Sequence, residues 1–216
     1  MPGRAWTVQR CTSRSDEQQI IQPGGYTELA MAVIVSMLRG VNVGGHNKIR
    51  MDALRALCES LGLRDAQTYV QSGNVVFRTK EPDLAALANR IEDAIEESFG
   101  FRPAVIIRTT SELKAVVAKN PFGRRRGINP GKLLVTFLAD DPSAEARDRV
   151  LQIKTEPEEL RIDGREVYIY FPNGMGRTKL SWPTIAKMLG TSGTGRNWNS
   201  VTKLLEIAEK LESVET

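Results

Sequence analysis

Residues Glu159–Phe171 read ELRIDGREVYIYF, and this stretch decides how the chain is expected to fold. Asp163 and Gly164 separate two runs that are rich in branched and aromatic side chains. An Asp-Gly pair between such runs is the strongest short sequence signal of a β-hairpin. The second run alternates tyrosine with valine and isoleucine, which predicts that both faces of the sheet are largely covered.

The segments on either side of this hairpin extend the pattern to a complete unit. Lys132–Ala139, KLLVTFLA, is predicted to be a strand, and a helix is entered through Asp141 and Pro142. After the hairpin, a helix follows Ser181, and Thr191–Trp198, TSGTGRNW, holds a short closing strand before a last amphipathic helix. Strand, helix, strand, strand, helix, strand is the order of a ferredoxin-like plait.

The first half of the chain shows the same order of elements. Its predicted elements are the strand Ala32–Gly40, a helix from Met51 to Gly62, the hairpin TYVQSGNVVF at Thr68–Phe77, a helix from Pro82 to Gly100, and the strand Ala104–Thr109. The sequence therefore predicts an α+β fold of two tandem ferredoxin-like (βαββαβ) plait units with an extra C-terminal helix.

Three boundaries follow from this order. Residues 31–110 form the first unit, 111–131 a linker helix and basic loop, and 132–216 the second unit with its C-terminal helix. Thr109 and Glu112 have capping-box spacing, which predicts the start of the linker helix. Residues 1–30 are interpreted as a flexible leader or a mis-called start, because Met31 directly precedes the first convincing strand.

Composition narrows the class of protein. The formal net charge of +4 permits an acidic partner without demanding one. Cys11 and Cys58 indicate no disulfide framework, and His46 has no recognisable catalytic context, so a buried structural thiol and a loop histidine are favoured. There is no motif for a metal, a haem or a dinucleotide, no apolar run of membrane-spanning length and no secretory signal, so a cytoplasmic protein is expected.

Unusual loop residues are expected to gather at one end of each sheet. In a plait, the loop after the first strand lies beside the tip of the hairpin. In the first unit, the candidate ligand-binding residues are Arg39, Asn42, Gly44, Gly45, Lys48, Gln71, Ser72 and Asn74. In the second unit, they are Asn173, Gly174, Gly176, Arg177, Lys179, Arg196, Asn197 and Asn199. Cationic donors together with exposed backbone amides suit an anion.

Five motifs resemble a known bacterial family. LRGVNVGGHNKIRM, YVQSGNVVF, NPF, YFPNGMGRTKL and GRNWNSVTKL follow one another from about Met31 to Lys210. The chain is identified as a member of the domain-of-unknown-function family numbered sixteen-ninety-seven, although Thr178 replaces a serine that often follows GMGR there. The resemblance implies two α+β plait-like units and brings no activity, cofactor or catalytic residue.

Three functions remain open at the level of sequence. The favoured hypothesis is binding of a phosphate-bearing ligand, either a nucleotide or a nucleic acid. The second is an enzyme acting on a small anionic metabolite, for which Asp52, Glu166 and His46 are available from flanking positions but lack the spacing of a known catalytic device. The third is an interaction or structural protein, in which Asn-Gly pairs form turns, asparagines cap helices and Trp198 anchors the two units. Catalytic residues and oligomeric state are left open.

Overall fold

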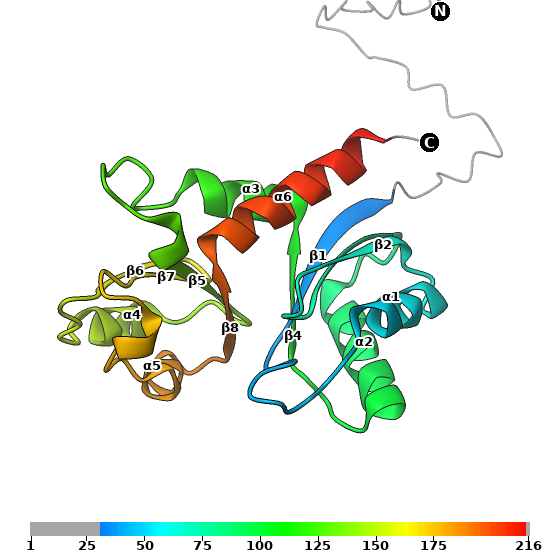
Figure 1. Ribbon diagram of the computed structural model, residues 1–216, viewed down its shortest axis with the longest axis horizontal. Coiled ribbons are helices and arrows are strands. Elements are labelled where there is room, and N and C mark those ends of the chain that lie inside the picture. Colours follow the sequence, from blue (N-terminus) through cyan, green and yellow to red (C-terminus); the bar gives the residue numbers. More distant parts are fainter. Residues whose placement is uncertain (1–30, 215–216) are drawn as a thin grey trace, which may run out of the picture.

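The structure is a computed structural model and describes residues 31–214. Over this range, the chain has an α+β fold with two four-stranded antiparallel sheets and six α-helices (Figure 1). The expected leader, residues 1–30, lies outside the described residues, as does Cys11.

The first sheet is built from the N-terminal half and has the strand order β2-β3-β1-β4. Its strands are β1 (Ala32–Leu38), β2 (Arg64–Tyr69), β3 (Asn74–Thr79) and β4 (Val105–Thr109). Two amphipathic helices, α1 (Met51–Ser60) and α2 (Leu84–Phe99), bury their apolar residues against this sheet. α2 begins at Leu84 instead of Pro82, because the Asp83 side chain caps the amides of the first turn.

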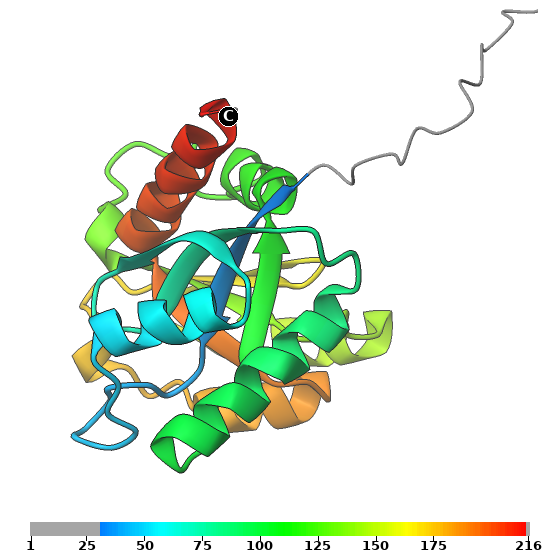
Figure 2. The ribbon, with the colours of Figure 1, turned by 90° about the vertical axis from the view of Figure 1, so that its right-hand side faces the viewer.

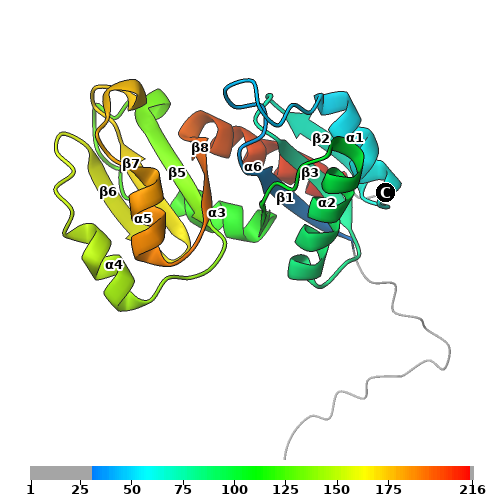
Figure 3. The ribbon, with the colours of Figure 1, turned by 90° about the horizontal axis from the view of Figure 1, so that it is seen from below.

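The second sheet repeats this arrangement with the order β6-β7-β5-β8. Its strands are β5 (Leu133–Leu138), β6 (Glu159–Asp163), β7 (Glu166–Tyr170) and β8 (Gly193–Asn197). The helices α4 (Ala144–Leu151) and α5 (Trp182–Leu189) pack on one face of it (Figure 3). The hairpin predicted around Gly164 is confirmed, and this residue has the positive φ, 55°, that the tight turn requires.

Two further boundaries differ from the sequence-based expectation. β2 begins at Arg64 and not Thr68, because pairing with β3 continues across an irregularity between Arg64 and Gln67. α4 begins at Ala144, later than expected, because the Ser143 side chain caps it.

Two helices lie between the sheets and join the halves. α3 (Thr110–Ala118) and α6 (Trp198–Ser213) run side by side (Figures 1 and 2). The predicted capping box of Thr109 and Glu112 at the start of α3 is confirmed.

Each of these helices contacts the sheet of the other half. α6 packs on β1 and β3, and the Tyr168 hydroxyl of β7 donates to the Val116 carbonyl of α3 at 2.9 Å. One apolar core therefore contains residues of both sheets and both helices, among them Val35, Val135 and Leu204.

The two halves correspond strand by strand. β1 pairs with β4 so that Val35 faces Arg108, and β5 pairs with β8 so that Val135 faces Arg196. Each arginine then reaches the other half: Arg108 Nη2 donates to the Leu138 carbonyl at 2.9 Å, and Arg196 Nη2 donates to the equivalent Leu38 carbonyl at 2.7 Å. The two edge strands thus hold the sheets together by reciprocal contacts.

Candidate functional site

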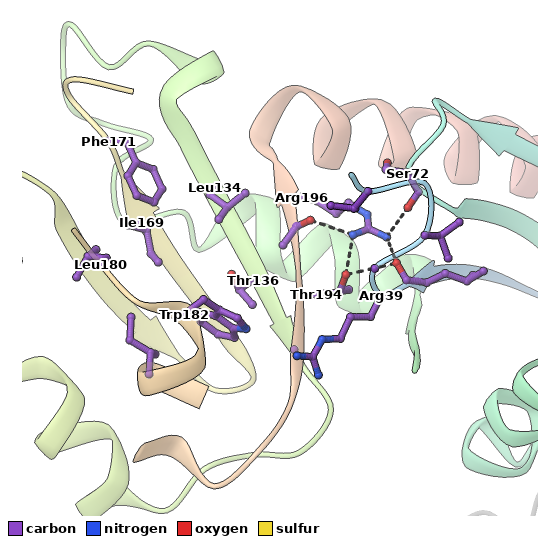
Figure 4. A pocket seen from close by; sticks show the side chains of 17 residues that line it. Arg39, Ser72, Leu134, Thr136, Ile169, Phe171, Leu180, Trp182, Thr194 and Arg196 are labelled. Carbon is purple, nitrogen blue, oxygen red and sulfur yellow. Dashed lines mark hydrogen bonds between the residues drawn. The ribbon is translucent and has the colours of Figure 1, made fainter. Parts of the chain in front are cut away.

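A cavity of about 410 Å³ lies where β8 faces the first half of the chain (Figure 4). Its lining is mostly apolar. From the second half come Leu134, Thr136, Ile169, Phe171, Leu180, Trp182, Ile185, Gly193, Thr194, Gly195 and Arg196, and from the first half Leu38, Arg39, Gly40, Val41, Val43 and Ser72. A volume of this size falls within the range of small-molecule sites, roughly 300–1,000 Å³.

Two glycines of β8 leave space on one side of the cavity. The equivalent positions of β4 are Val105 and Ile107, whose side chains are buried in the core of the first half. A Cβ at Gly193 would lie 2.8 Å from the Phe137 carbonyl oxygen, so close backbone approach requires glycine there. At Gly195, a Cβ would meet only the Leu134 side chain, at 3.3 Å, and φ is not in the left-handed region. Packing of the backbone therefore does not demand glycine at position 195.

Arg196 is a buried cation beside this cavity, with 6% of its surface exposed. A guanidinium has five N–H donors, and here every acceptor is uncharged. The acceptors are the Asn74 side-chain oxygen, the Thr194 hydroxyl at 2.7 Å, and the carbonyls of Gly195 at 2.9 Å, Leu38 at 2.7 Å and Ser72 at 3.0 Å. Burial lowers the pKa of Arg196 to about 10, so the side chain stays protonated at neutral pH.

The equivalent arginine of the first half is neutralised. Arg108 Nε donates to Glu166 at 2.9 Å. Glu166 and Asn74 occupy matching positions, because Phe137 pairs with Glu166 and Met37 with Asn74. Burial lowers the pKa of Arg108 and raises that of Glu166, while their mutual attraction opposes both shifts. One arginine has a buried carboxylate beside it, and the other has an amide.

Two further polar groups of the cavity have no partner among residues 31–214. Arg39 is exposed and follows β1, and its guanidinium extends toward β8 and the second half in Figure 4. Thr136 on β5 has only 2% of its surface exposed and lines the cavity, and its hydroxyl makes no hydrogen bond within the described chain.

The structure brings together some of the residues that the sequence singled out in the first half. Arg39, Ser72 and Arg196 line the cavity, and Asn74 lies behind Arg196. A separate, more open depression at the start of α1 is lined by Asn42, Gly45, Lys48 and Gln71, among others. The Asn42 side chain bonds to the Gln71 carbonyl and to both backbone groups of Ile49, so it closes the loop. Gly44, with φ 58°, lines neither opening.

The second-half candidates are dispersed. Asn173, Gly174, Gly176 and Arg177 form the turn after β7, which includes the 3-10 turn Met175–Arg177, and line none of the cavities described here.

Of the remaining second-half candidates, Arg196 lines the main cavity, and Lys179, Asn197 and Asn199 lie outside it. Lys179 lines a third depression with Glu156 and Glu158. Asn197 caps α6 by accepting from the Asn199 amide and donates to the Gly131 carbonyl. The candidate residues are therefore divided among three openings and a turn.

The sequence-based hypothesis missed the apolar part of the cavity. Leu134, Ile169 and Trp182 carry no signal of a site, because apolar strand and helix residues are ordinary core. The Gly-Thr-Gly run inside the predicted closing strand was the available signal, since glycine inside a strand marks close approach of a ligand or another backbone.

Cys58 and His46 lie where the sequence analysis expected them, as a buried thiol and a loop histidine. Cys58 is 1% exposed beneath α1, and burial raises its pKa to about 12. His46 lies exposed in the loop after β1. Within the described range, no group of three or more His, Cys, Asp or Glu side chains is placed to hold a metal ion. Of the six helices described, none is long and apolar enough to cross a membrane.

The two-sheet architecture with its shared core defines an α+β protein of two matching halves. The chain belongs to the family described as "Protein of unknown function (DUF1697)", which matches residues 31–168 and confirms the resemblance seen in the motifs. The conserved bacterial protein SP0830 from Streptococcus pneumoniae has a similar structure, with a TM-score of 0.62, 21% identity, and coverage of 83% of this chain and 99% of that chain. At this identity, the likeness concerns the fold alone. No curated protein matches the chain.

Proposed function

We propose that this protein binds a small organic anion in the cavity between its halves, and that a phosphate-bearing molecule of nucleotide size is the best candidate. The observation that carries the proposal is the buried charge of Arg196, which has no carboxylate partner among the described residues and lies beside a cavity kept open by Gly195. A buried charge is ordinarily paired, so an anionic guest would supply the missing counter-charge.

The two cations near the cavity have different roles. The N–H groups of Arg196 donate to acceptors within the protein, so Arg196 would attract an anion by its charge and not by direct hydrogen bonds. A unit negative charge about 6 Å away would gain about 3 kcal/mol at an effective dielectric constant of about 20. The Arg39 guanidinium has no partner in residues 31–214 and lies at the edge of the cavity, so it can donate to the anion directly, as paired N–H groups do with phosphate and carboxylate oxygens.

The size of the cavity favours a small molecule over a nucleic acid. A volume of about 410 Å³ accommodates one ligand largely enclosed by apolar walls. Binding of a polynucleotide would instead depend on many phosphate contacts along a surface.

The test compares two arginine variants in calorimetric titrations with nucleoside monophosphates and ribose 5-phosphate. Arg39→Ala should weaken binding of every phosphate at least about tenfold, because one charge-assisted contact is lost. Arg177→Ala is the matched control, since Arg177 is an exposed cation of a turn that does not line the cavity, and it should leave affinity unchanged. Equal affinities of wild type and Arg39→Ala would refute the assignment.

We infer as well that each half is a ferredoxin-like plait with the limits given by the sequence, 31–110 and 132–216 around a linker at 111–131. The strand orders β2-β3-β1-β4 and β6-β7-β5-β8, each with antiparallel neighbours, support this description.

A further inference from the structure

We infer that the body of the ligand is a flat ring system that lies against the β8 backbone at Gly195 and accepts or donates a hydrogen bond at the Thr136 hydroxyl. This inference rests on the proposed function, because it concerns the part of the same anion that lies away from Arg39. It narrows the ligand to an aromatic anion, such as a nucleoside monophosphate, and excludes sugar phosphates without a ring base.

The shape of the space comes from the difference between the two halves. Val105 and Ile107 on β4 are bulky where Gly193 and Gly195 on β8 have no side chain. Gly195 is exposed in the middle of an edge strand, so the planar peptide groups on either side of it are uncovered. A flat ring can contact such a surface over its whole face, which a puckered or branched group cannot do.

Aromatic side chains line the cavity beside β8. Trp182, the first residue of α5, is half-buried in the cavity wall, and its indole N–H has no acceptor in residues 31–214. Phe171 directly follows β7, lies on the far side of β5 from β8, and is buried (Figure 4). Aromatic rings favour offset stacking or edge-to-face contact with another ring, and Trp182 has in addition a free donor for a ring nitrogen or carbonyl.

Thr136 supplies the polar contact inside this apolar space. It is almost fully buried, its hydroxyl has no partner in the described chain, and it lines the cavity. Its oxygen reaches the open space of the cavity, unlike the Ser36 hydroxyl of the first half, which is closed off from solvent. A ligand atom that bonds to this hydroxyl gains a hydrogen bond inside an apolar space, so the residue serves to choose among rings.

The first half provides a matched control for Thr136. Ser36 occupies the equivalent position of β1, is 1% exposed, and its hydroxyl is also unpaired, but it lines none of the cavities described. Ser36→Ala should raise the melting temperature without changing ligand affinity. Thr136→Val, which keeps the shape and removes the hydroxyl, should weaken binding.

The experiment titrates wild type, Thr136→Val, Ser36→Ala and Gly195→Val with the four common nucleoside monophosphates and with ribose 5-phosphate. For wild type, we expect the best nucleotide to bind at least about tenfold more tightly than ribose 5-phosphate. Thr136→Val should weaken that nucleotide about 3- to 10-fold, the value of one hydrogen bond, and leave ribose 5-phosphate unchanged. Gly195→Val should remove the advantage of the nucleotide. Gly195→Ala, whose Cβ meets only the Leu134 side chain, provides a second variant if Gly195→Val does not fold.

The outcomes separate this inference from the proposal beneath it. If nucleotides and ribose 5-phosphate bind equally, and both depend on Arg39, the anion site stands and the ring site is refuted. The ring site is refuted as well if Thr136→Val and Ser36→Ala have the same affinity for the best nucleotide. If no phosphate binds, the anion site itself is refuted and the ring site with it.

Discussion

Replacing Asn74 by aspartate should cancel the charge on which anion binding depends. Asn74 is fully buried, and its side-chain oxygen accepts from Arg196 Nε, as Glu166 accepts from Arg108 Nε in the other half. Asn74→Asp thus gives Arg196 the counter-charge that its equivalent already has. An anion would then meet a neutral pair in place of a buried cation.

The expected loss of affinity is large. Removing an attraction of about 3 kcal/mol, the value at about 6 Å and an effective dielectric constant of about 20, weakens binding roughly 100-fold. The stability of the free protein should change much less. A charge-assisted hydrogen bond contributes about 1.5–3 kcal/mol, whereas the Tyr69 carbonyl loses its bond from the Asn74 amide, which costs about 1 kcal/mol, and the new carboxylate is desolvated.

Calorimetric titration with the tightest nucleoside monophosphate, together with thermal unfolding of the free protein, measures both effects. Asn74→Leu is the control, because it removes the hydrogen bonds of Asn74 without adding charge. It should lower stability and retain most of the affinity. A folded Asn74→Asp protein that binds as tightly as wild type would show that the charge of Arg196 does not act on the ligand, and the reasoning would fail.

Three further results follow from the same structure. Because burial lowers the pKa of Arg196 only to about 10, the calorimetric affinity for a fully ionised anion should stay constant between about pH 7 and about pH 9. The cost of burying this charge is also constant there, since the pKa of the unfolded side chain is higher still and it is protonated too. A steady decline in affinity would contradict this. In a Cys11→Ser background, Cys58 should resist a thiol reagent at about pH 8 until the protein unfolds, because burial raises its pKa to about 12; rapid labelling of native protein would count against it. Leu204→Ala in the shared core should cost about 2–5 kcal/mol and leave a single calorimetric transition, and two transitions would show that the halves unfold separately.

Local signals in the sequence were sufficient for most of the fold. The turn at Asp163 and Gly164, the capping box at Thr109 and Glu112, and the cap at Ser181 each depend on residues within four positions of one another. The amphipathic pattern of the last helix also showed which residues it buries, but not against what. That α6 covers β1 and β3 of the other half is a matter of long-range packing, which the pattern of one helix does not contain.

The candidate site was less predictable because its geometry is set by pairs distant in sequence. From the sequence, Arg196 was grouped with the loop residues, yet it lies in β8 and is buried by contacts with Leu38, Ser72 and Asn74, more than 120 residues earlier. Its direction follows from the register of β8 on β5, because neighbouring residues of a strand point to opposite faces. Arg177, like Arg196, follows two nearby glycines in the sequence, but it lies in a turn outside the cavity.

The correspondence between the halves separates what the fold needs from what it does not. Arg108 with Glu166, and Val105 with Ile107, show that the same architecture can neutralise its buried arginine and fill the space at its edge strand. Arg196 makes the same backbone contact, but Asn74 stands beside it in place of a carboxylate, and β8 has Gly193 and Gly195 in place of the bulky side chains, so neither absence is imposed by the arrangement of strands. An unpaired buried cation and an open apolar cavity each lower the stability of a free protein. The buried cation and the cavity occur together at β8, and Arg39, which has no partner in the described chain, lines the same cavity. This combination is the expected result if a ligand supplies the missing charge and volume.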